Sequence, residues 1–143
     1  MLTVGVLGPL DVSVHDRPVE LTSRALRTLL VAMAMAADTP VPVDRLAAAL
    51  WTDDLPEHMR RAVQTHLTRL RGALGAGYVV TEAAGYRLRV DPERVDALRF
   101  TRLLGLAAHA ADPASERGHL EAALALWRGV PFDDVRSEWL ERL

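Results

Sequence analysis

The strongest periodic pattern in the chain lies near its middle, where apolar residues recur every three or four positions. Such spacing places them on one side of a helix; they are Met59, Val63, Leu67, Leu70 and Leu74. The opposite side carries polar residues, namely Arg61, Gln64, Thr65, Thr68 and Arg69. Residues 58–81 contain four Arg and no Asp or Glu. The sequence therefore predicts an amphipathic helix over residues 58–73 with a cationic outer face.

Shorter patterns precede this helix. Apolar runs separated by turn residues predict a small antiparallel sheet at residues 3–7, 10–14 and 18–21. Thr22 or Ser23 is suited to cap a helix over residues 24–37, and Asp44 a shorter helix over residues 45–51. We expect Pro56 at the start of the arginine-rich helix, because proline is well tolerated in the first helical turn.

A β-hairpin is predicted directly after the arginine-rich helix. The glycines between residues 72 and 77 end the helix, and two strand-like runs follow at residues 78–81 and 86–90. The elements are then a small sheet, two helices, a third helix with a basic outer face, and a hairpin. This order is typical of a winged helix-turn-helix domain.

The last third of the chain has a different helical pattern. Residues 91–95 form a link, and helices are predicted over residues 96–111 and 113–128 and from residue 135 onward. This unit resembles the helical hairpin of tetratricopeptide-type repeats, which needs neighbours to cover its apolar faces. We therefore expect an α+β winged helix-turn-helix domain over residues 1–92 and an all-α helical-hairpin module over residues 93–143.

Composition limits the classes of protein to consider. Half of the 143 residues are hydrophobic, which is typical of a folded core, and the absence of Cys excludes disulfides and thiolate metal sites. A reducing cytosol is compatible with this composition, and no basic leader precedes the first apolar run, so we expect a cytoplasmic protein without a signal peptide. The apolar run at residues 29–37 is too short to span a bilayer, so no membrane association is expected.

Charge is distributed unevenly along the chain. The net charge is −2, but residues 1–90 carry 10 Arg against 9 acidic residues, and residues 91–143 carry 7 Arg against 10 acidic residues. A nucleic-acid surface would therefore be local and would lie in the first part. The outer face of the predicted helix suits a DNA major groove, since Arg binds guanine or phosphate, Gln pairs with adenine and Thr contacts phosphate or a thymine methyl group. The alternative is an ordinary solvated helix face.

Enzymatic chemistry has little support in the sequence. None of the five His stands at metal-ligand spacing, and no Ser lies in a nucleophile-elbow context. The glycine cluster at residues 72–77 follows a helix instead of a strand, which favours a turn over a phosphate-binding loop. We expect no enzyme activity, no cofactor and no metal site.

Five segments together resemble the Streptomyces antibiotic regulatory protein family of transcriptional activators. They are VGVLGPLDV, VPVDRLAAALW, QTHLTRLRGAL, GYRLRV and LEAALALWRGVPF. The resemblance implies a winged helix-turn-helix of the response-regulator type, followed by the start of a bacterial transcriptional activation domain. It further implies that the protein binds direct repeats in double-stranded promoter DNA as a homodimer of side-by-side protomers, recruits RNA polymerase, and regulates antibiotic or other secondary-metabolite biosynthesis.

The resemblance also implies roles for individual residues. Those that match the recognition helix and would face DNA are Arg60, Arg61, Gln64, Thr65, Thr68, Arg69 and Arg71. Trp51 matches an aromatic residue that approaches the DNA backbone, although a core tryptophan is an equal alternative. Tyr86 and Arg87 match the wing, where a phosphate contact is expected, with packing inside the hairpin as the alternative for Tyr86. The family often has a basic residue at the position of Glu82, and a carboxylate there argues against deep insertion of the wing into the minor groove.

The loop from Thr52 to Glu57 matches a region that similar domains use to contact polymerase, as the helical part also would. Taken together, these features predict a sequence-specific DNA-binding transcriptional activator. The alternative is a protein-interaction module in which the winged domain has lost DNA binding and the helical part docks a protein partner. Glu82 and the overall acidity of the chain favour that alternative.

Overall fold

A computed structural model describes residues 1–51, 55–133 and 135 of the chain. It begins with a three-stranded antiparallel sheet of β1 (Leu2–Gly5), β2 (Asp11–Val14) and β3 (Arg17–Pro18), with the strands paired in chain order. Leu2 and Val4 are buried while the residues between and after them are less so, as expected for a strand with one covered face. The predicted sheet is confirmed, although its third strand covers Arg17–Pro18 instead of residues 18–21.

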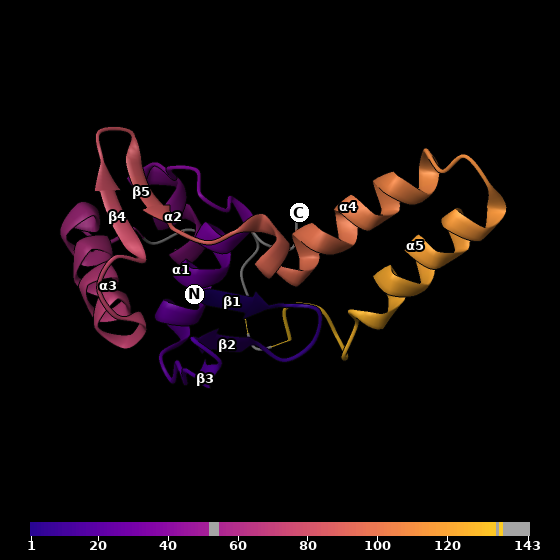
Figure 1. Ribbon diagram of the computed structural model, residues 1–143. Helices are drawn as coiled ribbons and strands as arrows, with labels where there is room; N and C mark the ends of the chain where they lie inside the picture. Colours follow the sequence, from indigo (N-terminus) through magenta and orange to yellow (C-terminus); the bar gives the residue numbers. More distant parts are fainter. Residues whose placement is uncertain (52–54, 134, 136–143) are drawn as a thin grey trace.

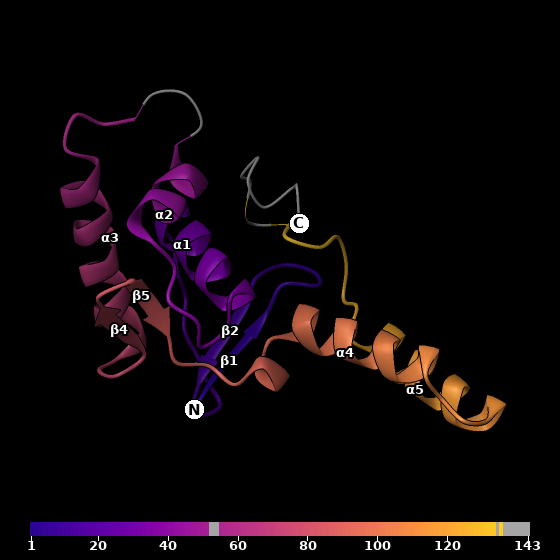
Figure 2. The same cartoon turned by 90° about the horizontal axis from the view of Figure 1, so that it is seen from above.

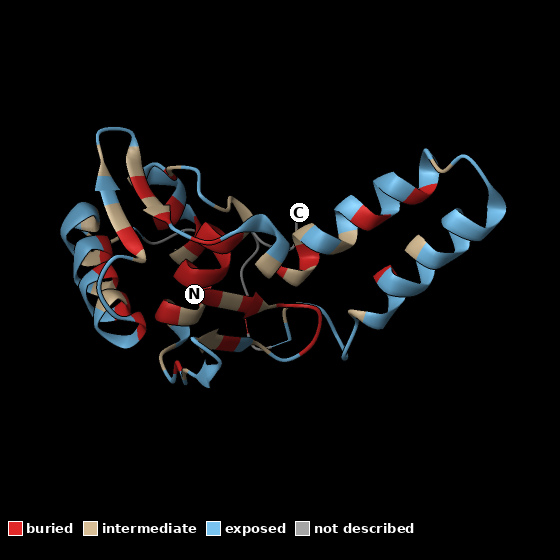
Figure 3. Cartoon of the chain, viewed as in Figure 1, coloured by how far each residue is buried: buried red, intermediate tan, exposed pale blue. Residues whose placement is uncertain are grey.

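Three helices pack against one another (Figure 1): α1 (Arg24–Met35), α2 (Val43–Leu50) and α3 (Met59–Leu74). The hydroxyl of Ser23 accepts a hydrogen bond from the Leu26 backbone N–H, as a helix cap should. Figure 3 shows that α1 is the most deeply buried helix, and its residues Leu29, Leu30 and Met33 are fully enclosed. These three helices and the sheet share one hydrophobic core.

Two predicted helix starts are wrong. Helix α2 begins at Val43, with Pro42 as its N-cap, so Asp44 lies inside the first turn instead of capping it. Its carboxylate still interacts favourably with the positive end of the helix dipole there. Helix α3 begins at Met59 after His58, so Pro56 precedes the helix and does not occupy its first turn.

The hairpin of β4 (Val79–Glu82) and β5 (Gly85–Leu88) follows α3, with Ala83 and Ala84 as its turn. Backbone hydrogen bonds between Val41 and Tyr86, with N···O distances of 2.8 and 3.0 Å, attach the hairpin to the segment before α2. Gly85 has a φ of +145°, and a Cβ built there would lie 2.1 Å from the Val41 carbonyl oxygen. The contact therefore requires glycine at this position.

A helical hairpin of α4 (Asp96–Ala108) and α5 (Pro113–Ala125) follows the short 3-10 helix η1 (Pro92–Arg94). Figure 2 shows α4 and α5 projecting from the sheet, at the end of the molecule away from α3. After α5 the chain returns to the sheet, where the N–H groups of Arg128 and Phe132 donate to the Leu7 and Val6 carbonyl oxygens, each over 2.7 Å. Gly8 permits this approach, because a Cβ there would lie 2.9 Å from the Arg128 Cβ.

The helical hairpin has little core of its own. Leu103, Ala107 and Ala123 are buried between the two helices. Large apolar side chains on these helices remain exposed, among them Leu104, Leu120 and Leu124, as does Trp127 just after α5. The predicted third helix from residue 135 lies outside the described residues, apart from Val135. None of the helices in the described ranges is both long and apolar enough to cross a membrane.

Candidate nucleic-acid interface

Helix α3 divides into a buried side and an exposed side as its sequence predicts. Val63, Leu67, Leu70 and Leu74 are buried against the core. The exposed side carries six of the polar residues singled out from the sequence: Arg60, Arg61, Gln64, Thr65, Thr68 and Arg69. Among the residues that the structure describes, no carboxylate lies within ion-pair distance of Arg60, Arg61 or Arg69. Their guanidinium groups are therefore available to an external anion.

The two threonines on this side use their hydroxyl hydrogens within the helix. Thr65 Oγ1 donates to the Arg61 carbonyl oxygen over 3.0 Å, and Thr68 Oγ1 donates to the Gln64 carbonyl oxygen over 2.9 Å. Such back-bonding is common for threonine in a helix and fixes the side-chain rotamer. The methyl group and the remaining acceptor capacity of each hydroxyl stay exposed.

Arg71 does not belong to this exposed side. It is half-buried in the last turn of α3, where its Nε donates to the Val79 carbonyl oxygen over 3.1 Å and its Nη2 donates to Thr81 Oγ1 over 2.5 Å. Both acceptors belong to β4. The side chain of Arg71 therefore joins the helix to the hairpin.

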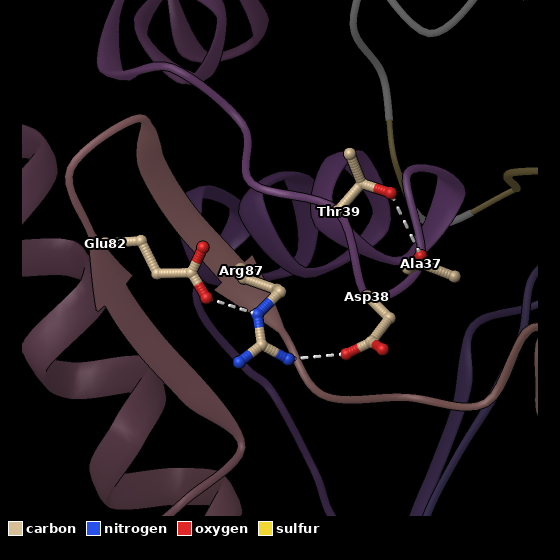
Figure 4. A network of polar contacts seen from close by, with 5 residues as sticks. All are labelled: Ala37, Asp38, Thr39, Glu82 and Arg87. Carbon is tan, nitrogen blue, oxygen red and sulfur yellow. Dashed lines mark hydrogen bonds and ion pairs between the residues drawn. The ribbon is translucent and has the colours of Figure 1, made fainter.

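Arg87, on β5, lies between two carboxylates (Figure 4). Its Nε is 2.5 Å from Glu82 Oε1, and its Nη1 is 2.6 Å from Asp38 Oδ1. The hydrogen bonds to Glu82 and then to Asp38 raise the pKa of the Arg87 guanidinium above its ordinary value, so it stays charged. The sequence did not suggest the partnership with Asp38, because Asp38 lies 49 residues away in the chain.

The two aromatic residues assigned from the resemblance are not freely exposed. Tyr86 is 8% exposed and packs in the core, which favours the packing alternative over a phosphate contact for this side chain. Trp51, the C-cap residue of α2, is half-buried, and its ring centroid lies 6.4 Å from that of His66 on α3. This contact favours the core alternative for Trp51.

His66 was not among the residues that the sequence assigned to DNA contact. It lies on α3 at the border of the core, and its Nδ1 is buried without a hydrogen-bond partner among the described residues. Burial, and to a lesser extent the charge of Arg69, lower the pKa of His66 below its ordinary value. The imidazole is therefore held neutral at neutral pH.

Two further expectations concern the loop predicted to contact polymerase and the binding of metal. In the loop predicted to contact polymerase, residues 52–54 lie outside the described residues, while Leu55 and Glu57 are exposed. Within the described part of the chain, no three His, Asp or Glu side chains are grouped so that they could hold a metal ion.

Comparison with known proteins places this geometry in a family. Residues 16–88 match the family model described as transcriptional regulatory protein, C terminal, and residues 95–143 match the bacterial transcriptional activator domain. The chain belongs to the Streptomyces antibiotic regulatory protein family. The resemblance drawn from the five sequence segments is thereby confirmed.

Several curated relatives are transcriptional regulators. Transcriptional regulatory protein EmbR of Mycobacterium tuberculosis is 36% identical over 95% of this chain and 37% of its own length. Transcriptional regulator RedD of Streptomyces coelicolor is 32% identical over 92% of this chain and 41% of its own length. Regulatory protein DnrI of Streptomyces peucetius is 32% identical over 95% of this chain and 55% of its own length. The chain thus spans only about two fifths to one half of these relatives.

The structure has a close counterpart among solved structures. The structure of Mycobacterium tuberculosis EmbR in complex with a low-affinity phosphopeptide aligns with 99% of this chain and 40% of that chain, with a TM-score of 0.87 and 30% sequence identity. This agreement covers both the winged part and the helical part. A winged helix fold followed by a helical module is therefore confirmed, whereas the likeness to tetratricopeptide repeats stays a prediction.

Proposed function

We propose that this protein binds double-stranded promoter DNA through the exposed side of α3 and activates transcription. The observation that supports this most is the set of guanidinium groups on Arg60, Arg61 and Arg69, which point outward from a helix whose other side is buried. Helix α3 also lies at the opposite end of the molecule from α4 and α5, so the chain's own C-terminal part does not cover it (Figures 1 and 2).

We assign different roles to the residues of this surface. Arg61, Gln64 and Arg69 project from the exposed side of α3 and are the candidates for base readout, with the methyl groups of Thr65 and Thr68 as partners for thymine. Arg60, in the first turn, is a candidate for phosphate contact. Arg71 and Arg87 are not assigned direct contacts, because each already bonds to other parts of the protein.

The wider biological role rests on family membership. We propose that the protein reads direct repeats as side-by-side protomers, that residues 93–143 form the start of an activation domain, and that it recruits RNA polymerase. The regulated genes would encode antibiotic or secondary-metabolite biosynthesis, and the site of action would be the cytoplasm. The exposed apolar side chains of α4 and α5 are consistent with further packing or protein contact in this part.

The test is a double substitution, Arg61→Ala with Arg69→Ala, measured by fluorescence anisotropy. The probes are a duplex selected from a random library by the 143-residue chain, and a scrambled duplex. Removing one base-reading Arg costs about 1–3 kcal/mol, so we expect the double variant to lose at least about tenfold in affinity for the selected duplex. Arg99→Ala with Arg102→Ala on α4 removes the same charge far from α3 and serves as the control.

Two outcomes would contradict this function. Unchanged affinity of the Arg61 and Arg69 double variant at low salt would show that the proposed surface is wrong. Absence of any binding to either duplex by the unmodified chain at low salt would favour the protein-interaction alternative, since even non-specific affinity should appear under that condition.

A further inference from the structure

The outer face of the β4–β5 hairpin carries a compact group of three charges. Because side chains alternate along a strand, Val80 and Glu82 on β4 share a face with Arg87 on β5, which is paired with Val80. Asp38, just after α1, approaches the same guanidinium group from the other side. Two carboxylates therefore surround one cation, and the group has a formal charge of −1.

This group lies near the proposed DNA-binding surface. Glu82 and the turn residues Ala83 and Ala84 line a hollow that Arg60, at the start of α3, also lines. The hairpin turn thus lies beside the helix that would face DNA. A cation exposed at this place could add a phosphate contact, but the Arg87 side chain is only 23% exposed and is bonded on both sides.

We propose that Glu82 and Asp38 sequester Arg87 from DNA and thereby limit the affinity of this protein for DNA. The inference rests on the proposed function of α3. A DNA phosphate would compete with the two carboxylates for the N–H donors of the Arg87 guanidinium. An arginine that binds a phosphate releases about one counterion from the DNA. The paired carboxylates therefore keep one potential phosphate contact out of use, and the DNA-binding energy depends more heavily on the readout surface of α3.

The test removes the negative charges of Glu82 and Asp38 and keeps the size and shape of both side chains. The variant is Glu82→Gln with Asp38→Asn; asparagine suits position 38, where φ is +59°. We expect DNA affinity at low salt to rise about three- to tenfold, with a salt dependence steeper by about one unit. Adding Arg87→Gln to this variant should remove the gain, because the released cation carries it.

A matched control separates this effect from a general change in charge. Glu116→Gln with Glu121→Gln removes two carboxylates from α5, at the far end of the molecule, and should change affinity less than about twofold. Circular dichroism and thermal unfolding of every variant establish that each is folded.

Each outcome bears on the inference separately from the proposed function. A gain that is absent, or that persists when Arg87 is also replaced, overturns the sequestration of Arg87 while leaving α3 as the DNA-binding element. If the unmodified chain binds no DNA and the Arg61 and Arg69 variant behaves likewise, the proposed function itself fails.

Discussion

Oδ1 of Asp96, the first residue of α4, accepts a hydrogen bond from the backbone N–H of Val6 over 2.7 Å. The other carboxylate oxygen accepts from the Leu7 N–H over 3.1 Å and lies 3.9 Å from Arg128 Nη2. One side chain thus satisfies two donors of the segment after β1, contacts the chain that returns from α5, and starts the helical hairpin. The side chain is only 14% exposed, so water replaces these bonds poorly.

We expect Asp96→Ala to lower the free energy of unfolding by roughly 2–4 kcal/mol, because it leaves two poorly hydrated N–H groups without an acceptor. Urea denaturation followed by circular dichroism measures this. Asp11→Ala removes an exposed carboxylate from the neighbouring strand and should stay within about 0.5 kcal/mol of the unmodified chain. Equal stability of the two variants would show that the contacts of Asp96 with Val6, Leu7 and Arg128 do not stabilise the fold.

Substitutions of Arg71 and Arg69 should have different effects, the first on stability and the second on DNA binding. Arg71→Ala removes two hydrogen bonds between α3 and β4, so we expect faster amide hydrogen exchange in β4 and β5 and a loss of about 1–2 kcal/mol in stability. Arg69→Ala, on the exposed side, should leave exchange and stability unchanged but weaken DNA binding. Unaltered exchange in the hairpin of the Arg71→Ala protein would exclude a positioning role for this side chain.

His66 predicts a specific dependence of stability on pH. Its pKa is lowered in the folded protein, so the unfolded chain binds the proton more readily and unfolding takes up a proton. The contribution of neutral His66 to the free energy of unfolding is fully present above the ordinary His pKa of about 6.5. It decreases as the pH falls from there towards the lowered pKa of the folded protein. Urea titrations between pH 8 and about 5 should show this decrease.

Replacing His66 by Gln should flatten that part of the profile, whereas His58→Gln, at an exposed position just before α3, should not. If both variants retain the slope of the unmodified chain, the decrease comes from other groups and the burial of His66 has no effect on proton binding.

Local patterns predicted the elements that carry the candidate site. The spacing of Val63, Leu67 and Leu70 was sufficient to identify the buried side of α3, because helical periodicity is a property of consecutive residues. The hairpin was predicted for the same reason. Helix starts were less predictable, since several nearby residues can cap a helix and only the path of the chain decides between Pro42 and Asp44.

The partners of the arginines could not be predicted in this way. Arg71 was assigned to the DNA-facing set because it matches the recognition helix of the family, yet its acceptors are on β4. Arg87 meets Asp38 only once the hairpin packs beside the end of α1. What covers the apolar side of α5 could not be predicted either. Periodicity shows that Leu120 and Leu124 lie on the same side of the helix, but it does not show what packs against that side.

The path of the chain around the helical hairpin has a mechanical consequence. The polypeptide leaves the winged part through Val95, which forms a parallel bridge with Val4, and comes back to it at Phe132, bonded to Val6. A helical hairpin attached at one end to β1 and at the other end to the residue directly after β1 resists rotation about either attachment. In a protein bound to DNA through α3, these two attachments would then fix the distance from the duplex to the far tip of α5. Binding sites with different helical phasing would have to be accommodated by bending of the DNA or by rotation of the whole chain.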